Sequence, residues 1–379
     1  MRLGIITNLI APYRTPIYER LANLPGVDLL VVYETAMEPN RYWDVGVQLP
    51  FPHTILRSWT LDLRRLAPDA FMHVPRRPLA ALRRFAAEAV VASGGGIWSS
   101  PANVAALAAR PRRGWGLIPS WESFRHRHPS LPRRIAEPWV RAFMRSGDAW
   151  IAWGTRASQD VVRLGADPAR TITIPQVALQ LRPEREGADG ARDRKAFLFV
   201  GQLIERKGVR ILLDAIRKVP GFEIWIAGDG PLRPAVEAAA STDSRIVYHG
   251  HLEAHELARL YADATALVLP SLYEVWGLVV NEALDNGTPV VVTDQVGAAD
   301  DLVEEGVTGY AVRAGSSDEL AAALRAVGSW SASRRAVCRE RARELLRDYT
   351  FETAATRIAE ACRVGIDARR SSGRSARRS

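Results

Sequence analysis

The sequence predicts an α/β protein with two Rossmann-like, doubly wound domains that face each other across a cleft. Three observations support this prediction. Short runs of valine, isoleucine and leucine alternate with amphipathic helical segments in both halves of the chain. Continuous apolar strands of this kind are typical of parallel sheets that helices cover on both faces. A charged, non-periodic stretch separates the two halves, and a chain of 379 residues is long enough for two domains.

The expected strands are short, apolar and rich in β-branched residues, and helix-like segments such as 78–89 lie between most of them. In the first half they are 3–7, 27–33, 89–93, 116–120, 149–153 and 171–175. In the second half they are 196–201, 222–228, 245–250, 266–270, 289–293 and 309–312.

The domain boundaries follow from these elements and from composition. A first domain is expected over 1–176, a linker over 177–195, a second domain over 196–350, a terminal helix that can cross back over 351–366, and a disordered Arg/Ser tail over 367–379.

The composition is that of a cytoplasmic enzyme with a basic first half. Net charge is +9, and residues 1–190 hold 25 Arg and no Lys against 16 acidic residues. No apolar run approaches the roughly 18 residues that would span a bilayer, and the opening apolar run is interpreted as a strand rather than a signal peptide. Cys338 and Cys362 belong to no metal-ligand spacing and favour a reducing compartment.

Two glutamates, Glu274 and Glu282, lie in the otherwise apolar segment 271–292. A helix is expected to begin near Trp276 or Gly277 and to end near Asp285, which places Glu274 before the helix and Glu282 inside it. On one continuous helix the two carboxylates would lie about 12 Å apart along the axis. A retaining glycosidase needs about 5–5.5 Å, so the spacing does not support a glycosidase pair.

The start of this helix is a candidate phosphate site. Free N–H groups around Gly277, Leu278 and Val279 would face an anion, and glycine lets the backbone come close. Glu282 lies on the same helix face as Leu278, and helical side chains lean towards the N-terminus. A carboxylate there would meet the neutral hydroxyls beside the phosphate, such as those of a ribose.

Cations that could balance these acids follow the strand 196–201. Arg206 and Lys207 are expected at its carboxyl end, the edge where open parallel sheets bind ligands. Lys207 is one of three lysines in a chain with 48 arginines. This rare use of lysine indicates that the position requires a compact ammonium rather than any positive charge. An exposed basic turn before a helix is the simpler alternative.

Four segments, in this order, carry a resemblance to a known family. GQLIERKGV, IAGDGPLR, IVYHGHL and PSLYEVWGLVVNEALDNGTPVVVTDQVG resemble the nucleotide-sugar-binding domain of the family 4 glycosyltransferases. These are retaining enzymes of the GT-B fold with a Glu-x7-Glu motif. The resemblance covers about residues 196–312, and residues 148–175 resemble the segment that closes the first domain of such enzymes.

The resemblance implies roles for particular residues. Glu274 would be catalytic, beside the transferred sugar, and Glu282 would bind the ribose hydroxyls. Lys207 would hold the diphosphate and stabilise its departure, and the amides of Leu278 and Val279 would cap it. The remaining donor-binding residues would be Gln202, Arg206 and Gly277 near the diphosphate and Gly250, His251 and Leu252 beside the base.

Two departures from the family pattern affect what can be carried over. The basic loop of the family starts Gly-Arg, with the arginine on the diphosphate, whereas this chain has Gln202 there. Arg206 is a candidate substitute. Many members have a Gly-Gly pair after the first strand, where this chain has NLIAPYR, Asn8 to Arg14.

The implied function is transfer of a sugar, with retention, from a nucleoside-diphosphate sugar to a glycan, a lipid-linked glycan or another hydroxyl acceptor, as in polysaccharide biosynthesis. No cofactor is expected, because the nucleotide sugar is a substrate. No Asp-x-Asp motif is evident in a suitable loop, so no metal is required.

The acceptor side is less defined. Glu122 follows a predicted strand end and is a candidate acceptor contact, and His126 and His128 lie nearby in a loop more typical of a solvated surface. The segment 93–101 contains Gly95 and Gly96 and would either shape the acceptor cleft or form a flexible turn.

The basic first half has two interpretations. Arginine pairs occur at 64/65, 76/77, 83/84, 112/113 and 133/134, with Trp115, Trp121 and Trp139 among them. They would either bind an anionic membrane at the inner face, next to a lipid-linked acceptor, or form a solvated surface.

Other functions remain as alternatives. A nucleotide-sugar 2-epimerase of the same fold would act on the donor alone. A nucleic-acid-binding protein is suggested by the basic composition and the Arg tail, but no binding motif is present, and no nucleic acid is expected as a partner. Neither glycine-rich turn reads G-x-G-x-x-G, which argues against a dinucleotide-dependent dehydrogenase.

Overall fold

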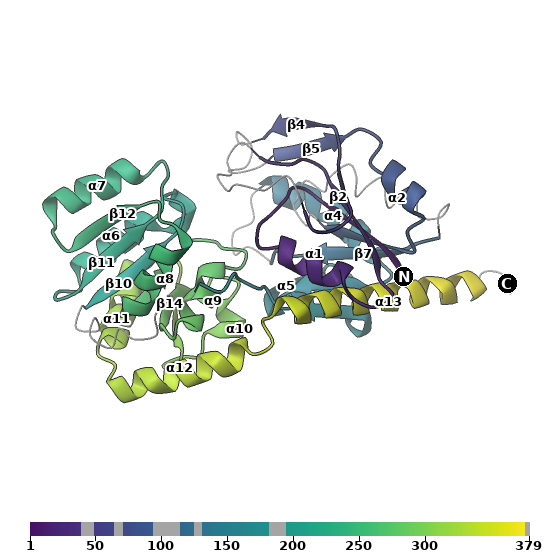
Figure 1. Cartoon of the computed structure of the whole chain (residues 1–379). Helices are drawn as coiled ribbons and strands as arrows, with labels where there is room; N and C mark the ends of the chain where they lie inside the picture. Colours follow the sequence, from purple (N-terminus) through teal and green to yellow (C-terminus); the bar gives the residue numbers. More distant parts are fainter. Residues whose placement is uncertain (39–48, 64–70, 94–113, 125–130, 182–194, 376–379) are drawn as a thin grey trace. The chain divides into compact units, whose positions relative to one another are not determined.

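The computed structural model describes residues 1–38, 49–63, 71–93, 114–124, 131–181 and 195–375. The chain forms two compact units, residues 1–176 with 350–379, and residues 177–349. Each unit has a parallel sheet with helices (Figure 1), which confirms the predicted α/β class with two doubly wound units. No helix in these described ranges is both long and apolar enough to cross a membrane.

The sheet of the first unit has seven parallel strands in the order β3-β2-β1-β6-β7-β8-β9. Its strands are β1 (Arg2–Thr7), β2 (Asp28–Tyr33), β3 (His53–Ile55), β6 (Ala89–Ser93), β7 (Gly116–Trp121), β8 (Trp150–Trp153) and β9 (Thr171–Ile174). Its helices are α1 (Thr15–Ala22), α2 (Ala80–Phe85), α4 (Leu131–Arg145), α5 (Thr155–Arg163), the 3-10 turn η1 (Pro168–Arg170) and α13 (Phe351–Ser375). Every strand predicted for this half is present. Most of these strands are apolar and buried in the sheet, whereas β9 alternates threonine with isoleucine and is mostly half-buried.

Three strands of the first unit were not predicted from the sequence. β3 is a three-residue edge strand, and β4 (Ser58–Asp62) pairs antiparallel with β5 (Phe71–Pro75). β4 is largely exposed, so it lacks the apolar run that marks the other strands. The pairing of residues 58–62 with 71–75 defines this hairpin, and no local hydrophobic pattern indicates that pairing.

The terminal helix α13 packs on the first unit, against α1 and the strands β6, β7 and β9. Gly365 of α13 lies directly over Gly116 of β7, since a Cβ added at Gly116 would be 2.8 Å from the Gly365 carbonyl carbon. The prediction that residues 367–379 are a disordered tail is wrong for 367–375, which continue the helix. Arg370 reaches Glu88 at 3.4 Å, and the Ser371 hydroxyl donates to the Asp367 carbonyl at 2.9 Å.

The sheet of the second unit has six parallel strands in the order β12-β11-β10-β13-β14-β15. These are β10 (Ala196–Val200), β11 (Glu223–Ala227), β12 (Ile246–Gly250), β13 (Ala266–Leu269), β14 (Val290–Thr293) and β15 (Gly309–Val312), as predicted. The strand order reverses between β10 and β13. Ligands of open α/β sheets bind at the carboxyl ends of the two strands that flank such a reversal.

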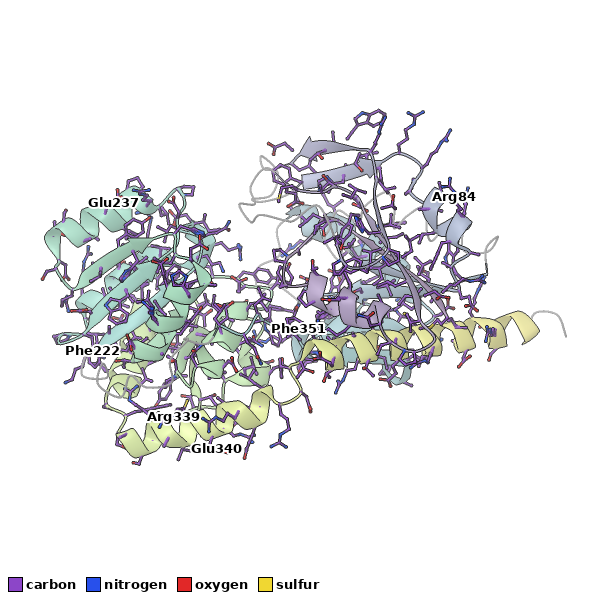
Figure 2. The ribbon with its side chains drawn as sticks, in the orientation of Figure 1. Arg84, Phe222, Glu237, Arg339, Glu340 and Phe351 are labelled. Carbon is purple, nitrogen blue, oxygen red and sulfur yellow. The ribbon has the colours of Figure 1, made fainter. Side chains whose placement is uncertain are left out.

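Helices cover both faces of this second sheet. They are the 3-10 turn η2 (Glu205–Lys207), α6 (Val209–Arg217), α7 (Arg233–Thr242), α8 (Ala254–Asp263), α9 (Leu278–Asp285), α10 (Ala299–Leu302), α11 (Ser317–Gly328) and α12 (Ala332–Leu346). Alternate residues of β10 enter two cores, with Phe197 on one face and Leu198 on the other. Phe197 stacks on Phe222, with ring centroids 4.7 Å apart; Figure 2 labels Phe222 near the sheet edge.

Candidate active site

Two loops meet where the strand order of the second sheet reverses. One loop leaves β10 and contains η2, and the other leaves β13 and leads to α9. The amide of Leu272 donates to the carbonyl oxygen of Arg206 at 2.8 Å and joins the loops. Gly208 lies so close to the second loop that a Cβ there would be 2.0 Å from the carbonyl oxygen of Pro270. The residues predicted to bind the donor diphosphate are therefore brought together by backbone packing.

Replacing Gly208 with alanine is expected to destabilise the second unit by about 2–4 kcal/mol, since a cost of about 1–3 kcal/mol for left-handed backbone is joined by a clash with Pro270. The φ of Gly208 is +70°. Gly221 is a matched control, because its φ is +81° and an added Cβ would meet nothing within 4 Å. Urea unfolding of both variants measures the difference, and equal losses would contradict the packing argument.

Lys207, Arg206 and Glu274 form an ion-pair cluster at this junction. The Lys207 ammonium lies 2.5 Å from Glu274 Oε2, and the side chains of both residues are only 13% exposed. Arg206 Nη1 lies 3.3 Å from the same carboxylate and also donates to the carbonyl oxygen of Tyr273 at 3.0 Å. Burial alone would raise the pKa of Glu274, but the two cations outweigh it and hold this pKa below its ordinary value. Glu274 is therefore a carboxylate at neutral pH.

The backbone on both sides fixes the position of Glu274. Its amide donates to the carbonyl oxygen of Gln295 at 2.9 Å, and its carbonyl oxygen accepts from the amide of Gly297 at 2.9 Å. These bonds tie the loop after β13 to the segment after β14. The carboxylate is thus held by neighbouring strand ends rather than by a free loop.

Helix α9 begins at Leu278, and Gly277 precedes it with a φ of +95°. This is the predicted start, and Glu274 and Glu282 lie before and inside the helix as expected. The first-turn amides of Leu278 and Val279 have no carbonyl one turn earlier in the helix to bind, so they are suited to an anion. Trp276 Nε1 donates to Asn281 Oδ1 at 2.8 Å and fixes this first turn.

Glu282 accepts a hydrogen bond from a tyrosine that sequence analysis missed. The hydroxyl of Tyr261, in α8, donates to Glu282 Oε2 at 2.7 Å. Burial raises the pKa of Glu282 above its ordinary value, although the bond from Tyr261 works in the opposite direction. Burial together with the Glu282 charge also raises the pKa of Tyr261, which remains a donor. No local signal in the sequence distinguishes Tyr261 from an ordinary core tyrosine.

The remaining predicted donor residues lie at the same carboxyl edge. Gln202 follows β10, while Gly250, His251 and Leu252 lie at and after the end of β12. β12 is separated from β10 by β11. Gly250, His251 and Leu252 therefore lie at the carboxyl edge of the sheet on the β12 side of the ion-pair cluster, and Gln202 lies at the end of β10.

In the first unit, Glu122 lies one residue past β7 and pairs with a buried arginine. Arg14 Nη2 is 2.7 Å from Glu122 Oε1 and 3.1 Å from Gln176 Oε1, and its guanidinium lies 3.4 Å from the ring centroid of Trp153. Arg14 comes from the loop in which this chain departs from the family pattern, and sequence analysis did not connect it with Glu122. Gly95 and Gly96 lie outside the described residues, as do His126 and His128.

Comparisons with known proteins point to glycosyltransferases. Residues 194–328 match the family model of the glycosyl transferases group 1. The chain is 32% identical over 245 residues to glycogen synthase from Mycobacterium tuberculosis, covering 59% of this chain and 58% of the relative. It is 28% identical over 182 residues to an uncharacterized glycosyltransferase of Methanocaldococcus jannaschii, covering 46% of each.

Solved structures cover nearly the whole chain. Anabaena HepE in complex with UDP has a TM-score of 0.73 at 17% identity and covers 95% of this chain and 99% of its own. Sucrose-phosphate synthase of Thermosynechococcus elongatus has a TM-score of 0.70 at 19% identity and covers 96% and 98%. At these identities the likeness concerns the fold.

The fold with its two doubly wound units is that of the GT-B glycosyltransferases. Within that class, residues 194–328 are a domain of the glycosyl transferases group 1, which confirms the predicted family at that level. The chain spans about half the length of the curated relatives it matches.

Proposed function

We propose that this protein is a retaining glycosyltransferase of the family 4 type, which moves a sugar from a nucleoside-diphosphate sugar to a hydroxyl acceptor. The observation that supports this most directly is the cluster of Lys207, Arg206 and Glu274 beside the start of α9, where the strand order reverses. Cations and free amides at one place suit a diphosphate. A buried carboxylate beside them suits positive charge that develops on a transferred sugar.

Each residue of the site has a separate role in this proposal. Lys207, Arg206 and the amides of Leu278 and Val279 bind the diphosphate and stabilise the charge that grows on it as the sugar leaves. Glu282 binds the ribose hydroxyls, and Glu274 lies beside the anomeric carbon. Diphosphate binding also gives Lys207 a second partner besides Glu274.

The acceptor hydroxyl then attacks the anomeric carbon on the face that the diphosphate leaves. A phosphate oxygen of the donor takes the hydroxyl proton, so the enzyme needs no separate base, metal or cofactor for this step. In the first unit, Glu122 Oε1 accepts a hydrogen bond from Arg14 at 2.7 Å. In this proposal the Glu122 carboxylate also accepts a hydrogen bond from a hydroxyl group of the acceptor.

A thermal-shift panel of UDP, GDP, ADP and their sugars tests the proposed function. One nucleotide series is expected to raise the melting temperature, because a ligand at 100 times its Kd stabilises the native state by about 2.7 kcal/mol. The relatives include a structure of Anabaena HepE with UDP-glucose, so UDP is the first nucleotide to test. No shift with any member of the panel would refute a nucleotide-sugar donor.

We also propose that the acceptor is lipid-linked and that the first unit binds a membrane at its cytoplasmic face. The surface that supports this is the outer face of α4, where Leu131 is 69% exposed, Ile135 71% and Trp139 39%. Arg134 and Arg145 of the same helix are also exposed. Apolar and aromatic side chains with flanking arginines suit the interface of an anionic bilayer.

This surface differs from the one expected from the sequence. Trp115 and Trp121 are buried in the core, since their rings pack between sheet and helices, and only Trp139 of the three is exposed. Arg76, Arg77, Arg83 and Arg84 are exposed, as the prediction requires. The pairs at 64/65 and 112/113 lie outside the described residues.

Replacing Ile135 with glutamate is expected to weaken binding to vesicles of phosphatidylcholine with phosphatidylglycerol at least tenfold. It removes an apolar side chain whose burial in the bilayer would contribute about 1.5–3 kcal/mol, and it adds a charge that the anionic lipids repel. Val337→Glu is the control, because Val337 is an exposed apolar residue of the second unit, at 58%. Co-sedimentation at low salt measures both, and equal loss in the two variants would exclude α4 as the contact.

A further inference from the structure

The hairpin of β4 (Ser58–Asp62) and β5 (Phe71–Pro75) is a separate two-stranded sheet of the first unit, and Figure 1 labels both strands. It contains none of the residues assigned to the transfer reaction. His73 of β5 fixes its orientation, because this side chain is 3% exposed and its two ring nitrogens lie 3.0 Å from Thr60 Oγ1 and 3.2 Å from Glu38 Oε1. The face of the hairpin that carries His73 is therefore directed towards the rest of the unit.

The opposite face of the hairpin is apolar, although it is directed towards solvent. Trp59 pairs across the strands with Val74, and Leu61 pairs with Met72, so these four side chains share one face. Trp59 is 78% exposed and Leu61 44%, while Val74 and Met72 are half-buried. An antiparallel sheet with one solvated face normally places its polar residues there. This hairpin reverses that arrangement, which indicates that something other than water covers its outer face.

Exposed arginines lie at the end where the hairpin joins the unit. Arg57 precedes β4, and Arg76 and Arg77 follow β5. The Arg76 amide donates to the Arg57 carbonyl oxygen at 2.9 Å, which holds the two ends side by side. All three residues are exposed, and none of them forms an ion pair with an acidic residue of the described ranges. The partner of the apolar face therefore meets positive charge beside it.

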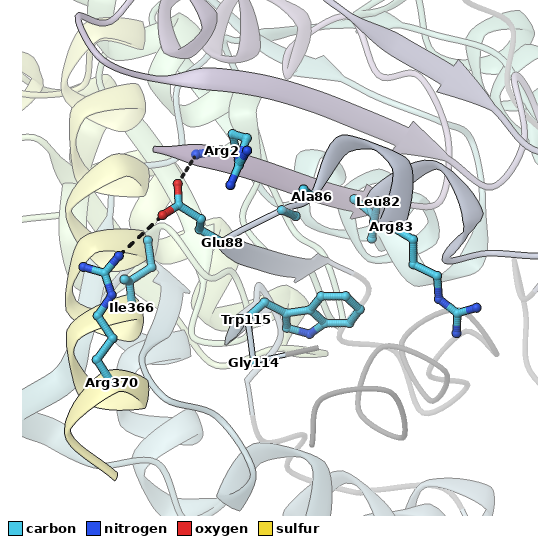
Figure 3. Close-up of a pocket in the computed structure, with 10 residues that line it drawn as sticks. Arg2, Leu82, Arg83, Ala86, Glu88, Gly114, Trp115, Ile366 and Arg370 are labelled. Atoms are coloured by element: carbon cyan, nitrogen blue, oxygen red, sulfur yellow. Dashed lines mark hydrogen bonds and ion pairs between the residues drawn. The ribbon is translucent and has the colours of Figure 1, made fainter. Parts of the chain in front are cut away.

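The positive charge continues into α2, the helix that follows the hairpin. Figure 2 labels Arg84 on this helix. Figure 3 is a close-up of the cavity of about 360 Å³ beside α2, and it shows Arg83 extending away from Glu88. Glu88 pairs instead with Arg370 at 3.4 Å. The arginines of α2 thus add to the basic surface that begins at the hairpin.

A bilayer with anionic lipids fits this surface better than a protein partner does. Tryptophan is enriched at the membrane–water interface, and arginines beside an apolar surface are attracted to anionic headgroups. A standard protein interface buries roughly 800 Å² on each partner. An aromatic side chain buries only about 150–250 Å², so one tryptophan with three aliphatic neighbours falls short of that area. A bilayer requires no matching shape and can be contacted by several small surfaces of one unit.

We propose that the β4–β5 hairpin is a membrane-docking element that inserts Trp59 and Leu61 into the interface of an anionic bilayer. This inference rests on the membrane association proposed for the first unit, but it assigns a contact to an element other than α4. Leu56 next to the hairpin, Leu82 of α2 and Val140 of α4 pack into one core, so the three elements lie on the same face of the first sheet. They can therefore contact one bilayer together.

Co-sedimentation with vesicles of phosphatidylcholine and phosphatidylglycerol at low salt tests the hairpin. Trp59→Ser is expected to bind at least tenfold more weakly than wild type and to keep its melting temperature, since Trp59 is exposed. Val337→Ser is the matched control, because Val337 is an exposed apolar residue of the second unit. Equal binding of wild type and Trp59→Ser would overturn the hairpin and leave α4 to the Ile135→Glu test. No binding by wild type would refute the membrane association itself.

An environment-sensitive dye on Leu61→Cys distinguishes direct contact from an indirect effect. The natural cysteines, Cys338 and Cys362, are buried, so the new thiol is the one that reacts. We expect the dye emission to rise when anionic vesicles are added, and Arg76→Gln to weaken this response about fivefold. The same dye on Val337→Cys should not respond. An unchanged emission at Leu61→Cys on bound vesicles would overturn the proposal, as would a rise with protein concentration alone, which would assign the face to a second copy of the chain.

Discussion

Lys207→Met is expected to reduce turnover by about 10²- to 10³-fold, the loss typical of a preorganised group that stabilises charge in the transition state. Methionine extends as far as the Cε position of lysine, with sulfur in place of Cδ, and lacks the ammonium. The assay is nucleoside diphosphate release from the nucleotide sugar that the thermal-shift panel selects. Lys207→Arg is expected to remain impaired, because a planar guanidinium does not reproduce a compact ammonium 2.5 Å from Glu274.

Lys207→Met should also be less stable than the wild type. Glu274 would lose its buried partner and keep only Arg206, which is 36% exposed. Removing one partner of a buried ion pair typically costs about 3–5 kcal/mol. Lys218→Met is the control, since Lys218 pairs with Asp318 at the surface, where a pair contributes about 0–1 kcal/mol. Full turnover in Lys207→Met would remove Lys207 from the mechanism.

Glu282→Gln is expected to weaken nucleoside diphosphate binding about 10- to 100-fold, because hydrogen bonds to a charged group contribute about 1.5–3 kcal/mol. Tyr261→Phe should give a smaller loss, since the carboxylate remains but loses the donor that orients it. Glu274→Gln should leave this affinity unchanged and lower turnover. Isothermal titration with the selected diphosphate distinguishes the three, and unchanged affinity in Glu282→Gln would contradict its role.

The raised pKa of Glu282 adds a pH dependence with a defined sign. As pH falls through this raised pKa, the carboxylate gains a proton and diphosphate affinity should fall, whereas Glu282→Gln should not show this change. A raised carboxyl pKa favours the protonated folded state. The protonated carboxyl of Glu282 contributes to folding stability at pH values below the ordinary pKa of glutamate. This contribution is lost as the pH rises through the raised pKa of the folded state. Glu282→Gln should therefore unfold at higher urea than wild type at neutral pH, and this gain should vanish in acid.

Most of the fold was predictable because its signals are local. Most strands of the two parallel sheets are apolar runs, so β10 and β13 could be placed from sequence, and with them the edge that carries Lys207 and Glu274. The start of α9 was predictable for the same reason, since Gly277 and the apolar run after it lie within one turn. The role of each residue at this edge stays a prediction.

The features that were missed depend on partners far apart in the chain. Tyr261 lies 21 residues from Glu282, and Arg14 lies 108 residues from Glu122. The residues between the partners carry no sequence signal of either pairing. The tail after Asp367 was misjudged because its Arg/Ser composition is typical of disorder. The helix continues into it because the preceding residues are already helical and pack at Gly116, and because Arg370 pairs with Glu88.

Helix α13 gives the first unit a discontinuous sequence, since residues 350–379 complete it after residues 177–349 have formed the other unit. During synthesis, the strands of the first sheet leave the ribosome long before the helix that covers them. Residues 177–349 are contiguous and can fold as soon as they emerge. Until α13 arrives, the face of β7 around Gly116 is uncovered, so the nascent first unit is the part of this protein that would most need a chaperone.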